Sequence, residues 1–414
     1  MLQSVGVRSV IVLNDFCQVQ GGASRVAVDE AVALDARGFD VTFLGAVGPV
    51  CLELRAANVK TVCLDQPELA DAMRRPTAAL RAFWNQRAYR ATRALLGTKD
   101  RHRTIVHLHG YTKALTAAPA LAARRAGFPV VCTLHDFFAA CPNGAFFDYR
   151  RQTPCELRAL SPTCITTACD KRHQLHKAYR VARGLAQRHV ARFPASVRDY
   201  ITLSRRSASL LKPYLPGDAR FHELANIIDV PYAPPVNVAA NRALVVVGRL
   251  DAEKGVELAA QTARAAGLPI VFVGDGPLRS SIEATGARVT GWVTTDRVQL
   301  ELEQARCLVF PSLWYETYGL VVAEAAARGV PAIVSDVAAP AERLVDGQDG
   351  WVFRSGDRDS LLRCMQHTRC DAAIRQAGAT AYRQYWSDPS DPARHAAELA
   401  SIYAAVMARD ASIG

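Results

Sequence analysis

Short apolar runs alternate with longer amphipathic stretches along most of the chain. In the first half the runs cover Ser9–Leu13, Asp40–Leu44, Thr104–Leu108, Pro129–Leu134 and Tyr200–Leu203. In the second half they cover Ala243–Val247, Pro269–Val273, Val289–Trp292, Cys307–Phe310, Pro331–Val334 and Trp351–Phe353. The stretches between the runs place apolar residues at helical spacing. This alternation predicts an α/β protein with two doubly wound, parallel-sheet domains of Rossmann-like type that face a cleft.

A Pro-rich segment separates the two series of runs. It covers residues 226–241 and is typical of an interdomain linker. We therefore expect one domain over residues 1–225, a second over 242–390, and a closing helix over 391–414. A chain of 414 residues is too long for a single core, which agrees with this division. In the first domain the alternation breaks between 137 and 170, which predicts a Cys-bearing insert.

The composition is that of an ordinary globular enzyme, with 50% hydrophobic and 21% charged residues. No apolar run reaches the ~18 residues that a membrane span needs. The first residues lead directly into a predicted strand, without the basic and apolar regions of a secretory signal. We therefore expect a cytoplasmic protein.

The net charge of +11 is concentrated in the first half of the chain. Residues 1–225 hold 32 Lys and Arg against 17 Asp and Glu, whereas residues 226–414 hold 18 against 22. The excess predicts an anionic partner for the first domain. The basic residues are dispersed and are not grouped with aromatic stacking platforms, so we expect no nucleic acid. An anionic membrane surface that carries a lipid-linked acceptor is the favoured partner, and the alternative is a solvated Arg-rich surface.

Two loops at predicted strand ends carry groups suited to a phosphate-bearing ligand. Gly21 and Gly22 precede a helix, where the backbone can approach a ligand and the helix N-terminus attracts negative charge. Arg249 follows a strand, and Lys254 begins the next helix. An arginine that binds two oxygens and a lysine that acts as a point charge suit a diphosphate. The dinucleotide fingerprint G-x-G-x-x-G is absent, which argues against a dehydrogenase.

A pair of glutamates marks the segment from 310 to 336. Glu316 lies in a loop after a strand, and Glu324 lies in the helix that follows. At ~1.5 Å per residue this spacing lets both carboxylates line one crevice at the carboxyl ends of the strands. Carboxylates accept hydrogen bonds only, which suits a polyhydroxyl ligand such as a sugar or ribose. The alternative reading is a solvated loop residue and a polar helix face.

The string PSLWYETYGLVVAEAAARGVPAIVSD resembles the nucleotide-sugar signature of the retaining family 4 glycosyltransferases, which have the GT-B fold. The resemblance covers nearly the whole chain and is more specific in the second domain. It implies that Arg249 and Lys254 hold the donor diphosphate, that Glu324 binds the nucleotide ribose, and that Glu316 contacts the donor sugar. It also implies that the closing helix crosses back to the first domain.

The resemblance assigns further donor contacts and a reacting centre. It places His135, in TLHD, beside the reacting atoms together with Glu316, Arg249 and Lys254. The remaining donor contacts are Gly21, Gly22, Gly274, Gly291, Trp292, Val293, Tyr318, Gly319 and Leu320. The implied mechanism is a front-face displacement with retention, in which cations and helix dipoles take the place of a catalytic metal.

The expected activity is transfer of a sugar from a UDP- or GDP-sugar donor to a hydroxyl of a glycan or lipid-linked acceptor. This transfer would serve cell-surface polysaccharide or glycolipid synthesis at the inner face of the plasma membrane. One alternative is a phosphorylase or epimerase on the same fold. Another is a non-catalytic protein that binds carbohydrate or nucleotide. A phosphorylase of the glycogen type would need a pyridoxal-binding lysine, for which the sequence shows no context, and an epimerase lacks the E-x7-E setting. The binding protein would not need Arg249, Lys254, Glu316 and Glu324 together.

Eleven cysteines in a cytoplasmic chain argue against a disulfide framework. Four of them lie in or next to the insert: Cys141, Cys155, Cys164 and Cys169. Their spacing does not match a paired C-x2-C ribbon, but four thiolates suit one structural Zn²⁺. Free thiols and, less favoured, disulfides stay as alternatives. A subset of the same family resembles this chain through HDFFAACPNGAFF, and the position after His135 favours a role in acceptor recognition.

Overall fold

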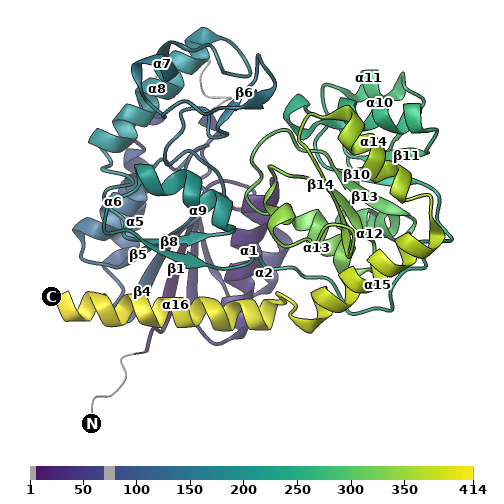
Figure 1. Cartoon of the computed structure of the whole chain (residues 1–414). Coiled ribbons are helices and arrows are strands. Elements are labelled where there is room, and N and C mark those ends of the chain that lie inside the picture. Colours follow the sequence, from purple (N-terminus) through teal and green to yellow (C-terminus); the bar gives the residue numbers. More distant parts are fainter. Residues whose placement is uncertain (1–5, 70–79, 414) are drawn as a thin grey trace.

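The computed structural model describes residues 6–69 and 80–413, and it contains two parallel sheets with helices on both faces (Figure 1). The first sheet has the order β3-β2-β1-β4-β5-β8-β9, and every neighbouring pair is parallel. Its strands are β1 (Ser9–Phe16), β2 (Asp40–Val47), β3 (Lys60–Cys63), β4 (Thr104–Leu108), β5 (Val130–Thr133), β8 (Asp199–Thr202) and β9 (Arg220–Glu223).

Helices cover this first sheet and belong to the same domain. They are α1 (Gly22–Ala36), α2 (Leu52–Ala56), α5 (Gln86–Leu96), α6 (Ala118–Arg125), α7 (Pro162–Thr166), α8 (Gln174–His189), α9 (Arg205–Leu211) and the 3₁₀ turn η1 (Lys212–Tyr214). The insert also holds a short antiparallel hairpin of β6 (Phe147–Asp148) and β7 (Thr153–Pro154). Apolar side chains of the central strands fill both faces of the sheet, which explains why these strands read as continuous apolar runs.

The second sheet has the order β12-β11-β10-β13-β14-β15 and is also parallel. Its strands are β10 (Leu244–Val247), β11 (Ile270–Val273), β12 (Arg288–Val289), β13 (Cys307–Phe310), β14 (Ala332–Ser335) and β15 (Gly350–Phe353). Its helices are η2 (Ala252–Lys254), α10 (Val256–Ala266), α11 (Arg279–Glu283), α12 (Thr295–Glu303), α13 (Leu320–Ala327), η3 (Ala339–Glu342), α14 (Arg358–His367) and α15 (Asp371–Ser387). The predicted fold class, two doubly wound parallel-sheet domains, is confirmed.

The last helix, α16 (Pro392–Ile413), leaves the second domain and lies along the first, where Figure 1 shows it in yellow. Its Tyr403 is fully buried there and joins the core that contains α1. The chain therefore crosses between the domains twice, and the two crossings touch, because the backbone N–H of Ile228 donates to Ser390 O at 2.9 Å. Within the described residues, no helix has both the length and the apolar character that crossing a bilayer requires.

Some sequence predictions were wrong in detail. The edge strands β3 and β9 were missed because their side chains are half-exposed and few are apolar. The Ala- and Arg-rich stretch Pro76–Leu96 favours one long helix, but the structure interrupts it: Leu80 and Arg81 are helical, a turn follows, and α5 begins at Gln86, where the side chain of Asn85 accepts a hydrogen bond from the N–H of Ala88. Residues 76–79 of that prediction lie outside the described residues. The basic stretch Lys171–Phe193 favours a helix over its whole length, but α8 covers only Gln174–His189.

Candidate functional site

A cleft of about 700 Å³ lies between the two domains. The first domain contributes the start of α1, and the second contributes α12 and α13, with the linker between them. Its lining residues include Gly22, Arg25, Asp29, Ile228, Asp229, Thr295, Asp296, Leu320, Glu324 and Arg328. The cleft is large enough for a nucleotide-sized ligand, since such sites measure about 300–1,000 Å³.

The glycine loop and the glutamate helix meet at this cleft. Gly21 is the N-cap of α1, and a β-carbon at Gly22 would stand 3.4 Å from Cδ1 of Leu320 on α13. Glu324, one turn further along α13, lines the same cleft. Burial raises the pKa of Glu324, and the cation of Arg25 across the cleft opposes that shift. The structure therefore brings Gly22, Leu320 and Glu324 together, as the sequence predicts, and adds Arg25.

Glu316 and Lys254 form an ion pair at the carboxyl ends of β10 and β13. The same carboxylate oxygen accepts from Nε1 of Trp314 at 2.7 Å and from Oγ of Ser312 at 3.2 Å. Burial alone would raise the pKa of Glu316. Lys254 and the two neutral donors outweigh burial and hold that pKa below its ordinary value. The carboxylate is thus ionised and fixed in orientation.

The Glu316 loop also touches the first domain directly. Oγ1 of Thr317 donates a 3.0 Å hydrogen bond to the backbone carbonyl of His135, which follows β5. Burial, followed by the neighbouring His109, lowers the pKa of the His135 imidazole to about 3. The His135 imidazole is therefore neutral. The backbone of His135 is hydrogen-bonded to the loop that carries Glu316, at the boundary between the domains.

Arg249 is not part of the Lys254–Glu316 cluster. Its guanidinium pairs with Asp251 at 2.6 Å and lies 3.6 Å from Glu253. Lys171 of the first domain binds the same two acids, at 2.7 Å and 3.3 Å. About half of the Arg249 side chain is exposed (51%), so it is free to turn toward a ligand.

The predicted glycine turn at Gly274 has a clear steric reason. Its φ is +144°, and a β-carbon there would stand 2.0 Å from the carbonyl oxygen of Gly248. Gly274 also pairs with Gly291, which brings the two loops side by side. Trp292 is 66% exposed, and neither it nor Val293 lines the cleft. Thr295 and Asp296, at the start of α12, do line it.

The residues at the start of α13 divide between the cleft and the protein interior. Gly319 is the left-handed N-cap of α13, where a β-carbon would stand 2.5 Å from Cγ of Pro340. Leu320 lines the cleft. The Tyr318 side chain instead packs beneath the linker, and its hydroxyl lies 3.4 Å from the carbonyl of Asn226. Only the backbone of Tyr318 remains for the predicted phosphate contact.

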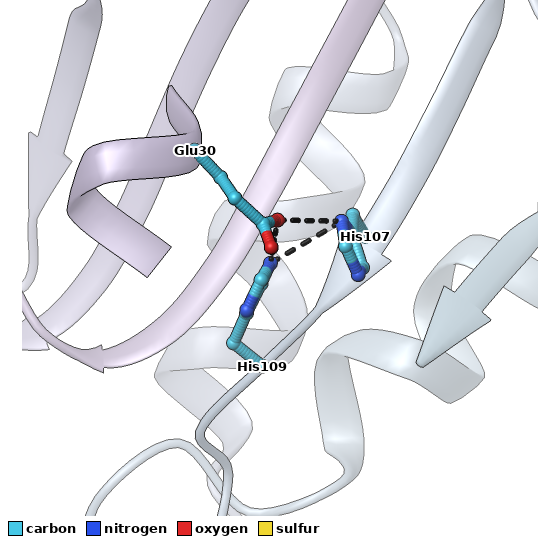
Figure 2. A group of neighbouring side chains, drawn as sticks. All are labelled: Glu30, His107 and His109. Atoms are coloured by element: carbon cyan, nitrogen blue, oxygen red, sulfur yellow. Dashed lines mark hydrogen bonds and ion pairs between the residues drawn. The ribbon is translucent and has the colours of Figure 1, made fainter. Parts of the chain in front are cut away.

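Behind His135 lies a buried cluster of Glu30, His107 and His109, which Figure 2 shows with the three side chains pointing toward one another. Glu30 Oε2 is 3.3 Å from Nε2 of His109 and 3.6 Å from Nδ1 of His107. Nδ1 of His109 lies 3.0 Å from Nε2 of His135. The cluster therefore connects α1 with the His135 ring through His109.

The three ligand atoms of this cluster lie within 4.8 Å of one another, a spacing that a metal ion could bridge. Two members of the cluster already have other hydrogen-bond partners. Nδ1 of His107 lies 2.7 Å from the Tyr403 hydroxyl. Oε1 of Glu30 lies 3.0 Å from Nε2 of His395. His395 thereby neutralises the only carboxylate of the cluster. A dication there would add uncompensated buried charge, so we interpret the cluster as a hydrogen-bonded network.

The four insert cysteines are free thiols, and Cys141, Cys164 and Cys169 are buried. Nζ of Lys177 lies 2.9 Å from Sγ of Cys169 and 3.9 Å from Sγ of Cys164. Among the described residues, the cysteines form no group with the mutual spacing of metal ligands. The structural zinc at Cys141, Cys155, Cys164 and Cys169 stays a prediction.

Sequence reasoning missed Arg25, Asp29 and Lys171 as cleft or interdomain groups. Arg25 and Asp29 form a 2.8 Å pair on the face of α1 that meets Glu324, and burial raises the pKa of Asp29 to about 6. Their spacing from Gly22, three and seven residues, places them on the same helix face. That spacing is a signal which could have indicated them.

Comparison with known structures defines the class of this protein as GT-B. A sucrose-phosphate synthase from Thermosynechococcus elongatus superposes with a TM-score of 0.66 and 16% identity, covering 97% of this chain and all of that one. The Anabaena protein Alr3699/HepE, solved with UDP and glucose, superposes with a TM-score of 0.64 and 15% identity, covering 96% and 100%. At these identities the likeness shows the fold alone.

The sequence then gives the family. The pattern described as Glycosyltransferase Family 4 matches residues 20–230, and that of Glycosyl transferases group 1 matches 241–370. The chain belongs to glycosyltransferase family 4.

Curated relatives cover part of the chain. Glycogen synthase of Mycobacterium tuberculosis is 29% identical over 229 residues, which are 50% of this chain and 55% of that protein. The putative teichuronic acid biosynthesis glycosyltransferase TuaC of Bacillus subtilis is 30% identical over 264 residues, which are 61% and 59%. The chain thus spans a little over half the length of these relatives.

Proposed function

We propose that the chain is a retaining glycosyltransferase that moves a sugar from a UDP- or GDP-sugar to a hydroxyl of a glycan or lipid-linked acceptor. The observation that carries the proposal is the ion pair of Lys254 and Glu316 at the carboxyl ends of the strands, in a loop that is hydrogen-bonded to the backbone of His135. A cation, an ionised carboxylate and a neutral imidazole there match the needs of a diphosphate leaving group and a sugar ring.

In this proposal Lys254 releases Glu316 when the donor binds and takes the donor diphosphate instead. Glu316 then accepts hydrogen bonds from the sugar hydroxyls. Arg249 turns from Asp251 to the same diphosphate, and Glu324 accepts from the ribose hydroxyls. The start of α13 supports the phosphates through its backbone N–H groups and its dipole.

The proposed transfer is a front-face displacement. The bond from the anomeric carbon to the diphosphate oxygen breaks, the bond from that carbon to the acceptor oxygen forms on the same face, and the acceptor's proton passes to the leaving diphosphate. No protein nucleophile is needed, so positioning and charge stabilisation by Lys254 and Arg249 account for the rate. His135, held neutral, orients the sugar beside the reacting centre.

Three facts about other proteins support the donor and the acceptor class. The Anabaena neighbour was solved with UDP and glucose, and a TarM structure with a TM-score of 0.62 and 9% identity contains UDP. TuaC is named for teichuronic acid biosynthesis. By analogy with these proteins, we propose that this chain uses a nucleotide-sugar donor and acts in polysaccharide synthesis at the inner face of the plasma membrane.

A thermal-shift and hydrolysis screen against UDP- and GDP-sugars tests the proposal. A ligand at 100 times its Kd stabilises the folded state by about 2.7 kcal/mol, which such a screen detects. We expect one nucleotide family to stabilise the wild-type chain and to lose this effect in Glu324→Ala. The matched control is Glu223→Ala, which alters an exposed glutamate on edge strand β9 of the other domain. Absence of any stabilisation or cleavage would reject the proposal.

A further inference from the structure

The first domain has a second cavity, of about 250 Å³, beside α8 and the loop that follows β4. Four cationic side chains line it: Lys113, Arg172, Arg180 and Arg183. The one carboxylate among its lining residues is Glu68. None of these residues lines the cleft between the domains, so this cavity is a separate feature.

Arg183 is the least compensated of the four cations. One of its guanidinium nitrogens donates to the carbonyl of Thr112 at 2.8 Å, and no carboxylate of the described residues lies within 4 Å of it. Burial lowers the pKa of the Arg183 guanidinium, and the like charge of Arg180 acts in the same direction. A half-buried cation without a carboxylate partner gains stability from a bound anion.

The other three cations are not fully neutralised by carboxylates, so the cavity carries a net positive charge. Arg180 lies 3.3 Å from Asp170, which also binds His176 at 2.9 Å, so one carboxylate serves two groups. Lys113 is exposed, and its Nζ faces the Phe16 ring at 5.3 Å. No ion pair of Lys113 or Arg172 occurs in the part of the chain that is described. Guanidinium groups bind two phosphate oxygens at once, and a lysine adds a point charge.

The cavity lies at the carboxyl ends of β4 and β5, the strands that lead to His109 and His135. Phe138, three residues after His135, lines it, and the guanidinium groups of Arg180 and Arg183 stack over its ring at 5.8 Å and 5.2 Å. The N–H of Phe138 donates to the Asp136 carboxylate at 3.0 Å, directly after His135. Thr112, three residues after His109, lines the cavity as well, so the loops that carry His109 and His135 both border it.

We propose that this cavity binds a phosphate or diphosphate group of the acceptor, and that Arg183 and Arg180 are its main ligands. The inference rests on the proposed function and names the chemistry of the acceptor: a phosphate-bearing saccharide. The phosphate could be linked to a lipid or belong to a free sugar phosphate, and both sources share the same recognition chemistry. Phe138 holds the two guanidinium planes in register.

The test uses the full-length chain and inorganic pyrophosphate as the probe, with UDP or GDP present to fill the donor cleft. We expect pyrophosphate to stabilise the wild type beyond the nucleotide alone. Arg183→Gln should raise the apparent Kd of pyrophosphate at least tenfold while nucleotide stabilisation stays unchanged. The control, Arg90→Gln, alters an exposed arginine on α5 that does not line this cavity. Arg180→Gln repeats the test should Arg183→Gln fail to fold.

Vesicles separate the two phosphate sources. Phosphatidylcholine vesicles containing phosphatidic acid present a lipid phosphate monoester, and vesicles with phosphatidylglycerol, added at the mole fraction that gives the same surface charge, present a phosphate diester. A lipid source predicts Arg183-dependent binding to the first kind alone, whereas a free sugar phosphate predicts pyrophosphate binding without vesicle binding.

The inference and the proposed function fail in different ways. Equal pyrophosphate stabilisation in the wild type and Arg183→Gln, or none in the wild type, overturns the inference. Loss of nucleotide binding with Arg183-dependent pyrophosphate binding intact overturns the donor assignment and leaves the anion site standing.

Discussion

The imidazole of His395 on α16 donates a hydrogen bond to the carboxylate of Glu30 on α1, with Nε2 and Oε1 3.0 Å apart. The other ring nitrogen, Nδ1, lies 2.9 Å from the carbonyl oxygen of Ala225. A carbonyl only accepts, so both nitrogens carry protons when Glu30 is ionised, and His395 is a buried imidazolium. This pair fixes the last helix to the first domain directly behind the His109–His135 contact.

The first prediction is that His395→Gln lowers the free energy of unfolding by about 3–5 kcal/mol near pH 6, as expected for loss of one partner of a buried ion pair. Burial disfavours the charged imidazole, but Glu30 outweighs it and raises the pKa of His395 above 6.5. The stabilisation is therefore fully present below pH 6.5 and is lost as pH rises through the folded-state pKa. Urea unfolding at pH 6 and 9 measures this difference.

At acidic pH the free energy of unfolding depends on the protonation of Glu30. Burial opposes its ionisation, but His109 and His395 hold its pKa below 4.5, so its contribution is lost only as pH falls through that lower value. Exposed His102 supplies the control, and His102→Gln should cost little at either pH. An identical cost of His395→Gln at pH 6 and 9 would contradict the assignment of a charged His395.

The second prediction concerns Arg249. Because half of its side chain is exposed and its partners Asp251 and Glu253 also bind Lys171, Arg249→Ala should leave the melting temperature within a few degrees of wild type. Loss of a cation that stabilises the leaving diphosphate should lower kcat at least ~100-fold. Initial rates and thermal melts of Arg249→Ala and of the exposed control Arg264→Ala measure both effects. Unchanged turnover would remove Arg249 from the site.

The third prediction is that His135 does not titrate in the working range. Since burial and His109 lower its pKa to about 3, the imidazole stays neutral above pH 4. The ratio of kcat/KM between the wild type and His135→Gln should therefore be constant from pH 5.5 to 8. The pH–rate profiles of the two proteins give this ratio. A tenfold change across that interval would show that a charged His135 takes part.

The local sequence pattern was enough to predict the fold class and to single out the candidate site residues of the second domain. The central strands are buried on both faces and appear in the sequence as apolar runs, and Glu316, Gly319 and Glu324 share one continuous loop and helix. Lys171 could not be found in this way, because its contacts with Asp251 and Glu253 form only when the two domains pack. The packing of the Tyr318 side chain against the linker likewise depends on the assembled fold, and the predicted contact of its backbone with a phosphate stays a prediction.

The last prediction tests the link between the domains. The hydroxyl of Thr317 donates to the carbonyl of His135, so it ties the Glu316 loop to the reacting centre. Thr317→Val keeps the shape and removes this bond, which is worth about 1 kcal/mol, or roughly fivefold in rate where it aligns reacting groups. We expect kcat to fall while nucleotide binding by thermal shift is unchanged, because the proposed contacts to the diphosphate and ribose, Lys254, Arg249 and Glu324, lie on the second domain. Thr317→Ser restores the hydroxyl that donates this hydrogen bond and should recover most of the rate. If Thr317→Val instead weakens nucleotide binding and leaves kcat intact, the threonine shapes the donor site and the domain contact has no part in turnover.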